Sequence, residues 1–212
     1  MKKLSQQIEE LNSNLSTQLS PEVIDTFGKS IHDLKTKNME ENSIRVGEKF
    51  PDFILFNADN QIINLTDLLK KEKVVIAFFR GNWCPYCNLE LKALQENSGK
   101  ITGKKATLLA ISPQKLDYSK ELRSNHRLEF ELLRDKDNAL AKQIGISFQL
   151  QDYAIPVYRD LGINLFDFNS NNENELPVPA VFVVDTDQTI IYKFMDSNYM
   201  NRLDINELIE NL

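Results

Sequence analysis

The two cysteines of this 212-residue chain are Cys84 and Cys87, and together they form a Cys-x-x-Cys motif. An apolar run with strand character, residues 74–79, precedes the motif, and a segment with helical character, residues 88–95, follows it. A dithiol between a buried strand and the start of a helix is typical of a redox site. The spacing therefore favours thiol oxidation or thiol–disulfide exchange.

The expected start of the helix explains how such a dithiol becomes reactive. Cys84 falls at or just before the helix N-terminus, where unpaired N–H groups and the helix dipole stabilise a thiolate. Pro85 suits the first helical position, because its missing N–H is not needed there. Cys87 lies about one turn further on, within reach of a disulfide bond. We predict that Cys84 is the exposed attacking thiol and Cys87 the sheltered resolving thiol.

Two other interpretations of the motif are half of a zinc site and a pair of inert core thiols. A zinc site needs a second pair of ligands, and the only histidines, His32 and His126, do not lie in a cluster with ligand spacing. Free cysteines are often buried in cores. The placement of both cysteines on one strand-to-helix turn favours the redox interpretation.

The composition excludes several classes of protein. Hydrophobic residues make up 42% of the chain, charged residues 26%, and the formal net charge is −6. A nucleic-acid partner requires a basic surface, so we expect none. The N-terminus lacks the pattern of a secretory signal, and the longest apolar run is too short to span a bilayer. We therefore expect a cytoplasmic protein without membrane contact, in which a cysteine pair is catalytic rather than structural.

Residues 1–43 are predicted to form an N-terminal helical extension. Two apolar stripes recur at helical spacing, first Leu4, Ile8, Leu11, Leu15 and Leu19, then Ile24, Phe27, Ile31 and Leu34. The sequence Ser20-Pro21-Glu22 between them is typical of a helix start. We expect the stripes to pack on the rest of the chain. A second copy of the chain, in a homodimer, is the alternative partner, and residues 38–43 are expected to be a polar linker.

Residues 44–212 are predicted to form one α/β domain. Expected strands cover residues 53–56, 62–65, 74–79, 106–112, 130–133, 181–184 and 190–194, with helices near 66–70, 88–95, 116–124, 139–144 and 204–212. The alternation of strands and helices predicts a central, mostly parallel sheet with helices on both faces. Residues 147–175 give no clear pattern.

Three stretches resemble a known family. They are Phe78–Leu91 around the dithiol, Ala110–Gln114, and Leu176–Asp185. In these stretches the chain resembles the thioredoxin superfamily, and more closely the peroxiredoxin-like branch of the AhpC/TSA family, from about residue 44 onward. The resemblance implies a thioredoxin-like fold and a thiol enzyme that reduces peroxides.

The resemblance also suggests which residues surround the dithiol. Thioredoxin-like folds carry a cis-proline at the position of Pro179, where the backbone of Val178 would pair with an extended substrate. Trp83 is expected to form an apolar wall. Arg80 either lowers the pKa of the thiol or points to solvent. Glu90 is more often a solvated acid than a proton relay.

The sequence departs from the family pattern at positions that hold peroxide. Typical peroxiredoxins carry Pro-x-x-x-Thr-x-x-Cys, and here Ala77 stands at the proline position and Gly81 at the threonine position. The neighbourhood that supplies an arginine in the family holds Pro179. Because these groups stabilise charge in the transition state, we expect slow but real peroxide turnover.

We therefore predict a peroxiredoxin-like thiol oxidoreductase that reduces peroxides through Cys84, with Cys87 resolving the sulfenic acid. A thioredoxin- or glutaredoxin-type electron donor would recycle the disulfide. No metal, haem or nucleotide site is visible. A protein disulfide reductase and a redox-sensing binding module are the alternative functions.

Overall fold

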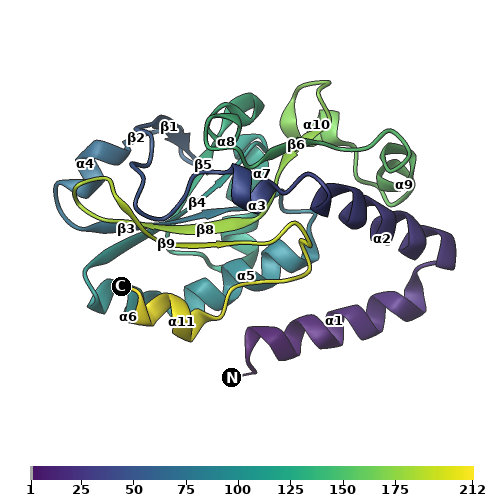
Figure 1. Ribbon diagram of the computed structural model, residues 1–212, viewed down its shortest axis with the longest axis horizontal. Coiled ribbons are helices and arrows are strands. Elements are labelled where there is room, and N and C mark those ends of the chain that lie inside the picture. Colours follow the sequence, from purple (N-terminus) through teal and green to yellow (C-terminus); the bar gives the residue numbers. More distant parts are fainter. Residues whose placement is uncertain (1) are drawn as a thin grey trace.

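The apolar run before the dithiol forms β3 (Lys73–Phe78), an interior strand of a seven-stranded sheet. The computed structural model describes residues 2–212 (Figure 1). The strand order in the sheet is β2-β1-β5-β4-β3-β8-β9. The other strands are β1 (Ile54–Asn57), β2 (Ile62–Asn64), β4 (Ala106–Ser112), β5 (Glu131–Arg134), β8 (Ala180–Val184) and β9 (Ile190–Met195).

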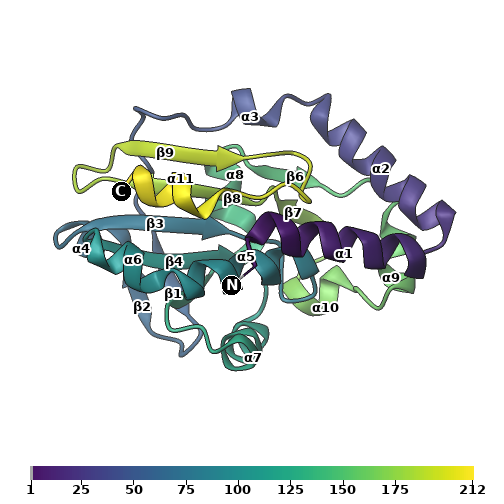
Figure 2. The same cartoon turned by 90° about the horizontal axis from the view of Figure 1, so that it is seen from below.

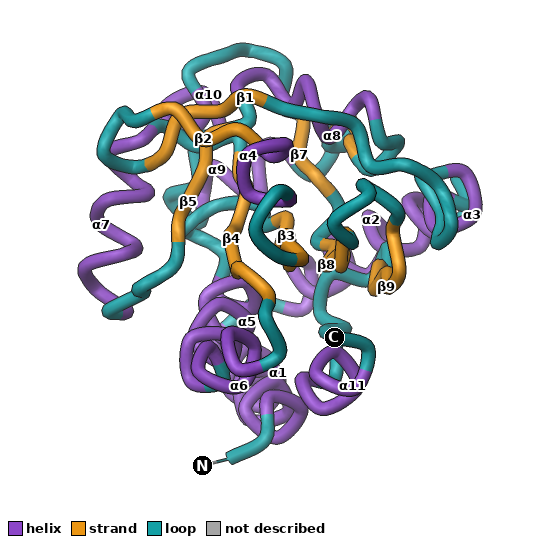
Figure 3. Tube along the Cα trace, turned by 90° about the vertical axis from the view of Figure 1, so that its left-hand side faces the viewer, coloured by secondary structure: helices purple, strands orange, loops and turns teal. Residues whose placement is uncertain are grey.

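The sheet is mixed, so the expectation of a mostly parallel sheet is wrong in that detail. Only the β3–β4 and β4–β5 pairs are parallel, and the four remaining pairs are antiparallel. The connections β1–β2 and β8–β9 are too short for a crossover helix, and such connections produce antiparallel hairpins. The predicted α/β class, with helices on both faces of the sheet, is confirmed (Figure 3).

Helices lie on both faces of the sheet. Their bounds are α4 (Leu65–Leu69), α5 (Pro85–Glu96), α6 (Ser98–Gly103), α7 (Leu116–His126), α8 (Ala139–Gln143), α9 (Ile155–Asp160), α10 (Leu165–Asn169) and α11 (Ile205–Glu210), with a 3₁₀ turn at Lys136–Asn138. Helices α5, α6 and α11 lie on one face, and α4 and α8 lie on the other (Figure 1).

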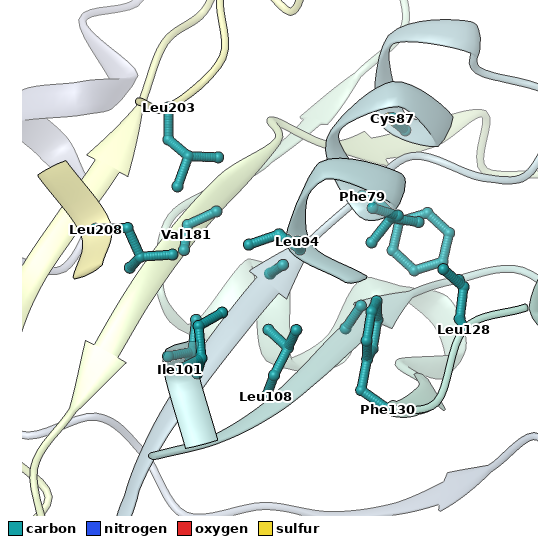
Figure 4. Packing of buried hydrophobic residues seen from close by; sticks show 14 of the residues in the cluster. Phe79, Cys87, Leu94, Ile101, Leu108, Leu128, Phe130, Val181, Leu203 and Leu208 are labelled. Carbon is teal, nitrogen blue, oxygen red and sulfur yellow. The ribbon is translucent and has the colours of Figure 1, made fainter. Parts of the chain in front are cut away.

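Strand β3 is buried on both faces, which explains its continuous apolar sequence. Val75 and Ala77 point into the core beneath α5, whereas Val74, Ile76 and Phe78 point into the core beneath α4 and α8. Cys87 on α5 belongs to the first of these cores, together with Leu94 of the same helix (Figure 4). The strand therefore places the start of α5 near its C-terminal end.

The N-terminal extension consists of α1 (Leu4–Gln18) and α2 (Pro21–Lys35), with Ser20 capping α2 as predicted. Helix α1 runs beside α5 beneath the sheet, and α2 turns back past α9 (Figure 2). Most residues of both apolar stripes pack on the same chain, whereas Ile24 is 40% exposed. Residues 38–43 are more than a polar linker, because they contain a helical turn, α3 (Met39–Asn42), with a buried Met39.

The segment without a clear sequence pattern, residues 147–175, is ordered around a small second sheet. Strands β6 (Ser147–Gln149) and β7 (Glu175–Pro177) pair, and α9 and α10 lie between them. Its apolar residues pack with α2 in a separate cluster. Within residues 2–212, no helix is both long and apolar enough to cross a membrane.

Candidate active site

Cys84 is the N-cap of α5, and Pro85 is the first residue of that helix, as predicted. The turn before the helix is closed by a hydrogen bond in which the backbone N–H of Cys84 donates to the carbonyl of Gly81 (3.1 Å). The thiol therefore lies where the unpaired N–H groups of the first turn and the helix dipole favour an anion.

Both thiols are completely buried, so the prediction of an exposed Cys84 is wrong. Cys84 and Cys87 each have 0% of their surface exposed, and both are free thiols. The sequence did not reveal that α1 packs against α5 and that the ring of Tyr199 lies over this end of the helix.

Arg80 is the cation that contacts the Cys84 sulfur most closely. Its side chain is buried, and Nη2 donates a hydrogen bond to Cys84 Sγ at 3.0 Å. Nη1 donates to the hydroxyl of Tyr158, also at 3.0 Å. The guanidinium lies 3.7 Å from the centre of the Tyr199 ring and 5.0 Å from that of Trp83. Of the two orientations that the sequence left open, Arg80 adopts the one that faces the thiol.

The surroundings shift the two thiol pKa values in opposite directions. Burial opposes ionisation of Cys84, but a hydrogen bond from Cys87 and the charges of Arg80 and Arg202 hold the pKa of Cys84 well below its usual range. Burial and the neighbouring Cys84 thiolate hold the pKa of Cys87 well above it. Because the thiolate is the nucleophile, the arrangement favours attack by Cys84.

A second arginine contacts Cys87. Arg202, from the segment between β9 and α11, donates from Nη2 to Cys87 Sγ at 3.4 Å and pairs through Nη1 with Glu90 Oε2 at 2.5 Å. Both members of the ion pair are buried, so the expectation that Glu90 is a solvated surface acid is wrong. Burial raises the pKa of Glu90, although Arg202 acts in the opposite direction.

Gly81 and Trp83 shape the loop between β3 and α5. A Cβ atom on Gly81 would lie 2.4 Å from Nε1 of Trp83, so the indole occupies the space that a side chain at position 81 would need. Trp83 packs edge-on against Tyr158, with ring centres 5.6 Å apart, and lines a cavity beside Arg80. Gly81 therefore allows the tryptophan to approach the dithiol loop.

Val178 and Pro179 do not form the expected substrate edge. No peptide bond among residues 2–212 is cis, so the Val178–Pro179 bond is trans. The backbone N–H of Val178 donates to the carbonyl of Ile146 (2.8 Å), and its side chain is buried in the cluster that joins β6 and β7 to α2. The N–H that a substrate would need is therefore already paired. Its acceptor lies beside the second sheet, which the sequence did not predict.

Three residues at this site were missed by the sequence interpretation: Tyr158, Tyr199 and Arg202. Tyr158 lies in the segment without a clear pattern, and the other two follow the last strand, where no motif marks them. The only available signal was a set of large and charged residues in otherwise polar loops. Within residues 2–212, no group of three or more His, Cys, Asp or Glu side chains is arranged to hold a metal ion.

The chain is similar to a known protein family and to individual members of it. The model of the AhpC/TSA family matches residues 46–193. Peroxiredoxin Bcp of Escherichia coli K12 is 27% identical over 105 residues, which cover 50% of this chain and 67% of that protein. A bcp protein of Coxiella burnetii is 30% identical over 104 residues, which cover 49% of this chain and 68% of its own length.

Solved structures share the fold at low sequence identity. BcpB from Mycobacterium tuberculosis aligns with a TM-score of 0.62 and 17% identity, covering 79% of this chain and 96% of its own. PrxQ from Xylella fastidiosa, solved as a cysteine-to-serine mutant, aligns with a TM-score of 0.62 and 13% identity over 79% of this chain and 94% of its own. The aligned fraction leaves about a fifth of this chain without a counterpart.

Proposed function

Because this chain belongs to the AhpC/TSA family, as a thiol-dependent peroxidase of the peroxiredoxin type, we propose that Cys84 is its attacking thiol and Cys87 its resolving thiol. The Cys84 thiolate attacks one peroxide oxygen, the O–O bond breaks, and the other oxygen leaves as an alcohol or water after taking up a proton. Cys84 becomes a sulfenic acid. Cys87 then displaces water from it, and a disulfide forms.

The observation that carries the proposal is the hydrogen bond from buried Arg80 to Cys84 Sγ. This guanidinium stabilises the thiolate before attack and can stabilise the negative charge on the departing oxygen. In typical peroxiredoxins a threonine hydroxyl and a later arginine hold the peroxide. Here Gly81 stands at the threonine position and Pro179 in the neighbourhood of the arginine, and Arg80 takes over their role. Arg202 serves Cys87 in the same way, because a cation beside the resolving sulfur favours its thiolate when it attacks.

The site favours a small peroxide over a protein disulfide. A protein substrate needs an open sulfur and an extended edge, whereas Cys84 is buried and the N–H of Val178 is already paired. Protein disulfide reduction therefore stays the second candidate.

Recycling requires an external dithiol to reduce the Cys84–Cys87 disulfide. We propose a thioredoxin- or glutaredoxin-type donor in the cytoplasm, where a cysteine pair is more often catalytic than structural. A protein donor must displace part of the cover formed by α1, since both sulfurs are buried. The net charge of −6 argues against a nucleic-acid partner, and a homodimer is the alternative to a single chain.

The test measures hydrogen peroxide and organic hydroperoxide consumption with a thioredoxin or glutaredoxin system, beside insulin disulfide reduction. We expect peroxide turnover in the wild type and none above background in Cys84→Ser. Cys87→Ser should react once and then stop with thioredoxin as donor. Insulin reduction without peroxide consumption would move the assignment to the disulfide reductase. A single oxidation without turnover in either assay would indicate a redox sensor.

A further inference from the structure

Five ionisable side chains form a buried cluster around the first turns of α5. Arg80 donates from Nη2 to Cys84 Sγ at 3.0 Å. Arg202 donates from Nη2 to Cys87 Sγ at 3.4 Å and from Nη1 to Glu90 Oε2 at 2.5 Å. None of the five side chains is more than 3% exposed. Because water is excluded from the cluster, its charges have to compensate one another.

The charges in this cluster compensate when one of the two thiols is ionised. The two guanidinium groups contribute two positive charges, and the Glu90 carboxylate contributes one negative charge. One thiolate therefore makes the cluster neutral, whereas a second would leave an unmatched negative charge in the interior. Without the carboxylate, the two arginines would match two thiolates. The low pKa of Cys84 and the raised pKa of Cys87 agree with a single thiolate.

The other titratable groups that face the cluster are neutral or lie at the surface. The neutral groups are tyrosines from α5, α9, β9 and the segment after β9, and burial raises the pKa of each: Tyr86, Tyr158, Tyr192 and Tyr199. The charged groups on the outer side of Arg202 and on α11 are exposed to water and salt, which screen them: Lys2, Lys3, Glu9, Glu96, Lys100, Asp204 and Glu207. The internal charge is therefore set by the two thiols, the two arginines and Glu90.

We propose that Glu90 is a positioning residue that limits the buried dithiol to one thiolate, so that Cys87 stays protonated until Cys84 has been oxidised. Glu90 acts through Arg202, whose charge it balances. The inference rests on the proposed function of Cys84. Before the reaction, the Cys84 thiolate neutralises the cluster. Oxidation converts this thiolate into a neutral sulfenic acid, and the unmatched positive charge then favours the thiolate of Cys87.

The resolving step then follows from this transfer of charge. The Cys87 thiolate attacks the sulfur of the Cys84 sulfenic acid, the S–S bond forms, and the S–O bond breaks. The oxygen leaves with the bonding electron pair and takes up the proton that Cys87 released, so that water is the product. The Cys87 sulfur is oxidised and the Cys84 sulfur is reduced to the level of the disulfide. Glu90 thus delays the second nucleophile until its target exists.

The first test measures thiol ionisation in the reduced protein without any peroxide. Carbon-13 chemical shifts of the labelled cysteine Cβ atoms report each thiol separately across pH. In the wild type we expect one thiolate near neutral pH, at Cys84. In Cys84→Ser, position 84 is uncharged, as it is in the sulfenic acid. The ratio of thiolate to thiol at Cys87 should therefore rise about ten-fold or more at a given pH.

The second test changes the charge of Glu90 while both cysteines remain. Glu90→Gln keeps an oxygen that accepts from Arg202 but removes the negative charge, so the thiolate-to-thiol ratio at Cys87 should rise about ten-fold. Glu90→Asp restores the charge and should titrate like the wild type. The matched control is Glu96→Gln, because Glu96 is exposed at the other end of the same helix. It should leave both titrations unchanged.

The outcomes separate this inference from the proposed function. An unchanged ratio at Cys87 in either Cys84→Ser or Glu90→Gln would overturn the single-thiolate limit and leave the peroxidase proposal intact. A rise in Glu90→Asp equal to that in Glu90→Gln would also overturn it, because shape rather than charge would then be the cause. The expected titrations in a protein that consumes no peroxide would retain the limit and overturn the proposed function.

Discussion

At the scale of single residues, each of the two thiols is contacted by its own buried arginine. Arg80 contacts Cys84, and Arg202 contacts Cys87 while its charge is balanced by Glu90. The thiolate at Cys84 thus faces one guanidinium, and the carboxylate of Glu90 faces the other. Each arginine is therefore neutralised by a specific partner, which is how charges are tolerated in a protein interior.

Replacing Arg80 should raise the pKa of the Cys84 thiol. The wild-type pKa of Cys84 is depressed, so its reaction with iodoacetamide should persist as pH falls below the usual thiol range and decline only through the depressed pKa. Arg80→Met removes a cation, and each unit of pKa lost corresponds to ~1.4 kcal/mol. We expect alkylation of Cys84 near pH 6 to slow by about ten-fold or more, as measured by peptide mass spectrometry.

The control for this experiment is Arg123→Met, which removes an arginine whose partner Asp59 lies at the surface. It should leave the alkylation profile unchanged. Cys84 should also react before Cys87 in the wild type, because the pKa of Cys87 is raised. Faster alkylation of Cys87, or an Arg80→Met profile that matches the wild type, would refute the assigned roles.

Breaking the Glu90–Arg202 pair should reduce stability. Arg202→Met leaves the Glu90 carboxylate buried without its partner, and removing one member of a buried pair typically costs about 3–5 kcal/mol. Urea denaturation measures the free energy of unfolding. The double variant Glu90→Gln/Arg202→Met removes both charges and should recover much of the loss. Equal destabilisation in the single and double variants would show that the pair is not the cause.

At the scale of elements, α1 acts as a cover over the start of α5. It packs against that helix, and the hydroxyl of Tyr86 on α5 donates to Asn12 Oδ1 on α1 at 2.6 Å. Helix α2 is tied to the loop after β6 by the pairs Ser30–Gln151 and Tyr153–Asp33, each 2.7 Å long. The N-terminal extension is therefore attached to the domain at several points. Among the described residues, Asn12 is the only residue of α1 whose side chain forms a hydrogen bond with α5.

Loosening this attachment should expose the thiols. Asn12→Ala removes the acceptor for Tyr86, and a side-chain hydrogen bond contributes about 1 kcal/mol. We expect modification of Cys84 by a bulky maleimide to accelerate about five-fold, as measured by stopped-flow kinetics. Asn14→Ala is the matched control, since Asn14 is exposed on the same helix and its carbonyl, not its side chain, accepts from Thr17. Equal acceleration in both variants would show that helix propensity, rather than the Tyr86 contact, controls access.

At the scale of the whole molecule, the extension belongs to the same hydrophobic core as the domain. Ile8, Leu11, Leu15 and Ile31 pack against the cluster that contains both cysteines, and Leu34 is buried with β6 and β7. These contacts use both apolar stripes within one chain. A dimer would therefore have to use another surface, or exchange the extension between copies.

Removal of residues 1–43 tests how far the domain depends on the extension. We expect the remaining 44–212 chain to fold with a lower melting temperature, because the loss exposes apolar surface at α5 and around Trp83. Tryptophan emission should shift to longer wavelength, and light scattering should give the same number of chains per particle as the intact protein. A truncated chain that does not fold would refute the boundary at residue 43. A smaller number of chains per particle would show that the helices also pair between copies.

The sequence by itself determined the parts of this protein that depend on local physics. The apolar run of β3 and the proline after Cys84 predict a strand followed by a helix start, and they place Cys84 at the N-cap. The resemblance around the dithiol identified the family, and the strand–helix alternation predicted the α/β class. The two N-terminal helices followed from their apolar stripes and from the Ser20 cap.

Only the tertiary structure decided the environment of the two sulfurs. Arg80 is four residues from Cys84, but its direction depends on Tyr158 and Tyr199, which come from distant segments. Arg202 reaches Cys87 over 115 positions of sequence, and burial of its partner Glu90 could not be read from an acid on an amphipathic helix. Val178 lost its expected role because Ile146, beside the unpredicted strand pair β6–β7, accepts from its N–H. Burial and charge pairing are properties of packed neighbours, and those neighbours are set by the fold rather than by sequence spacing.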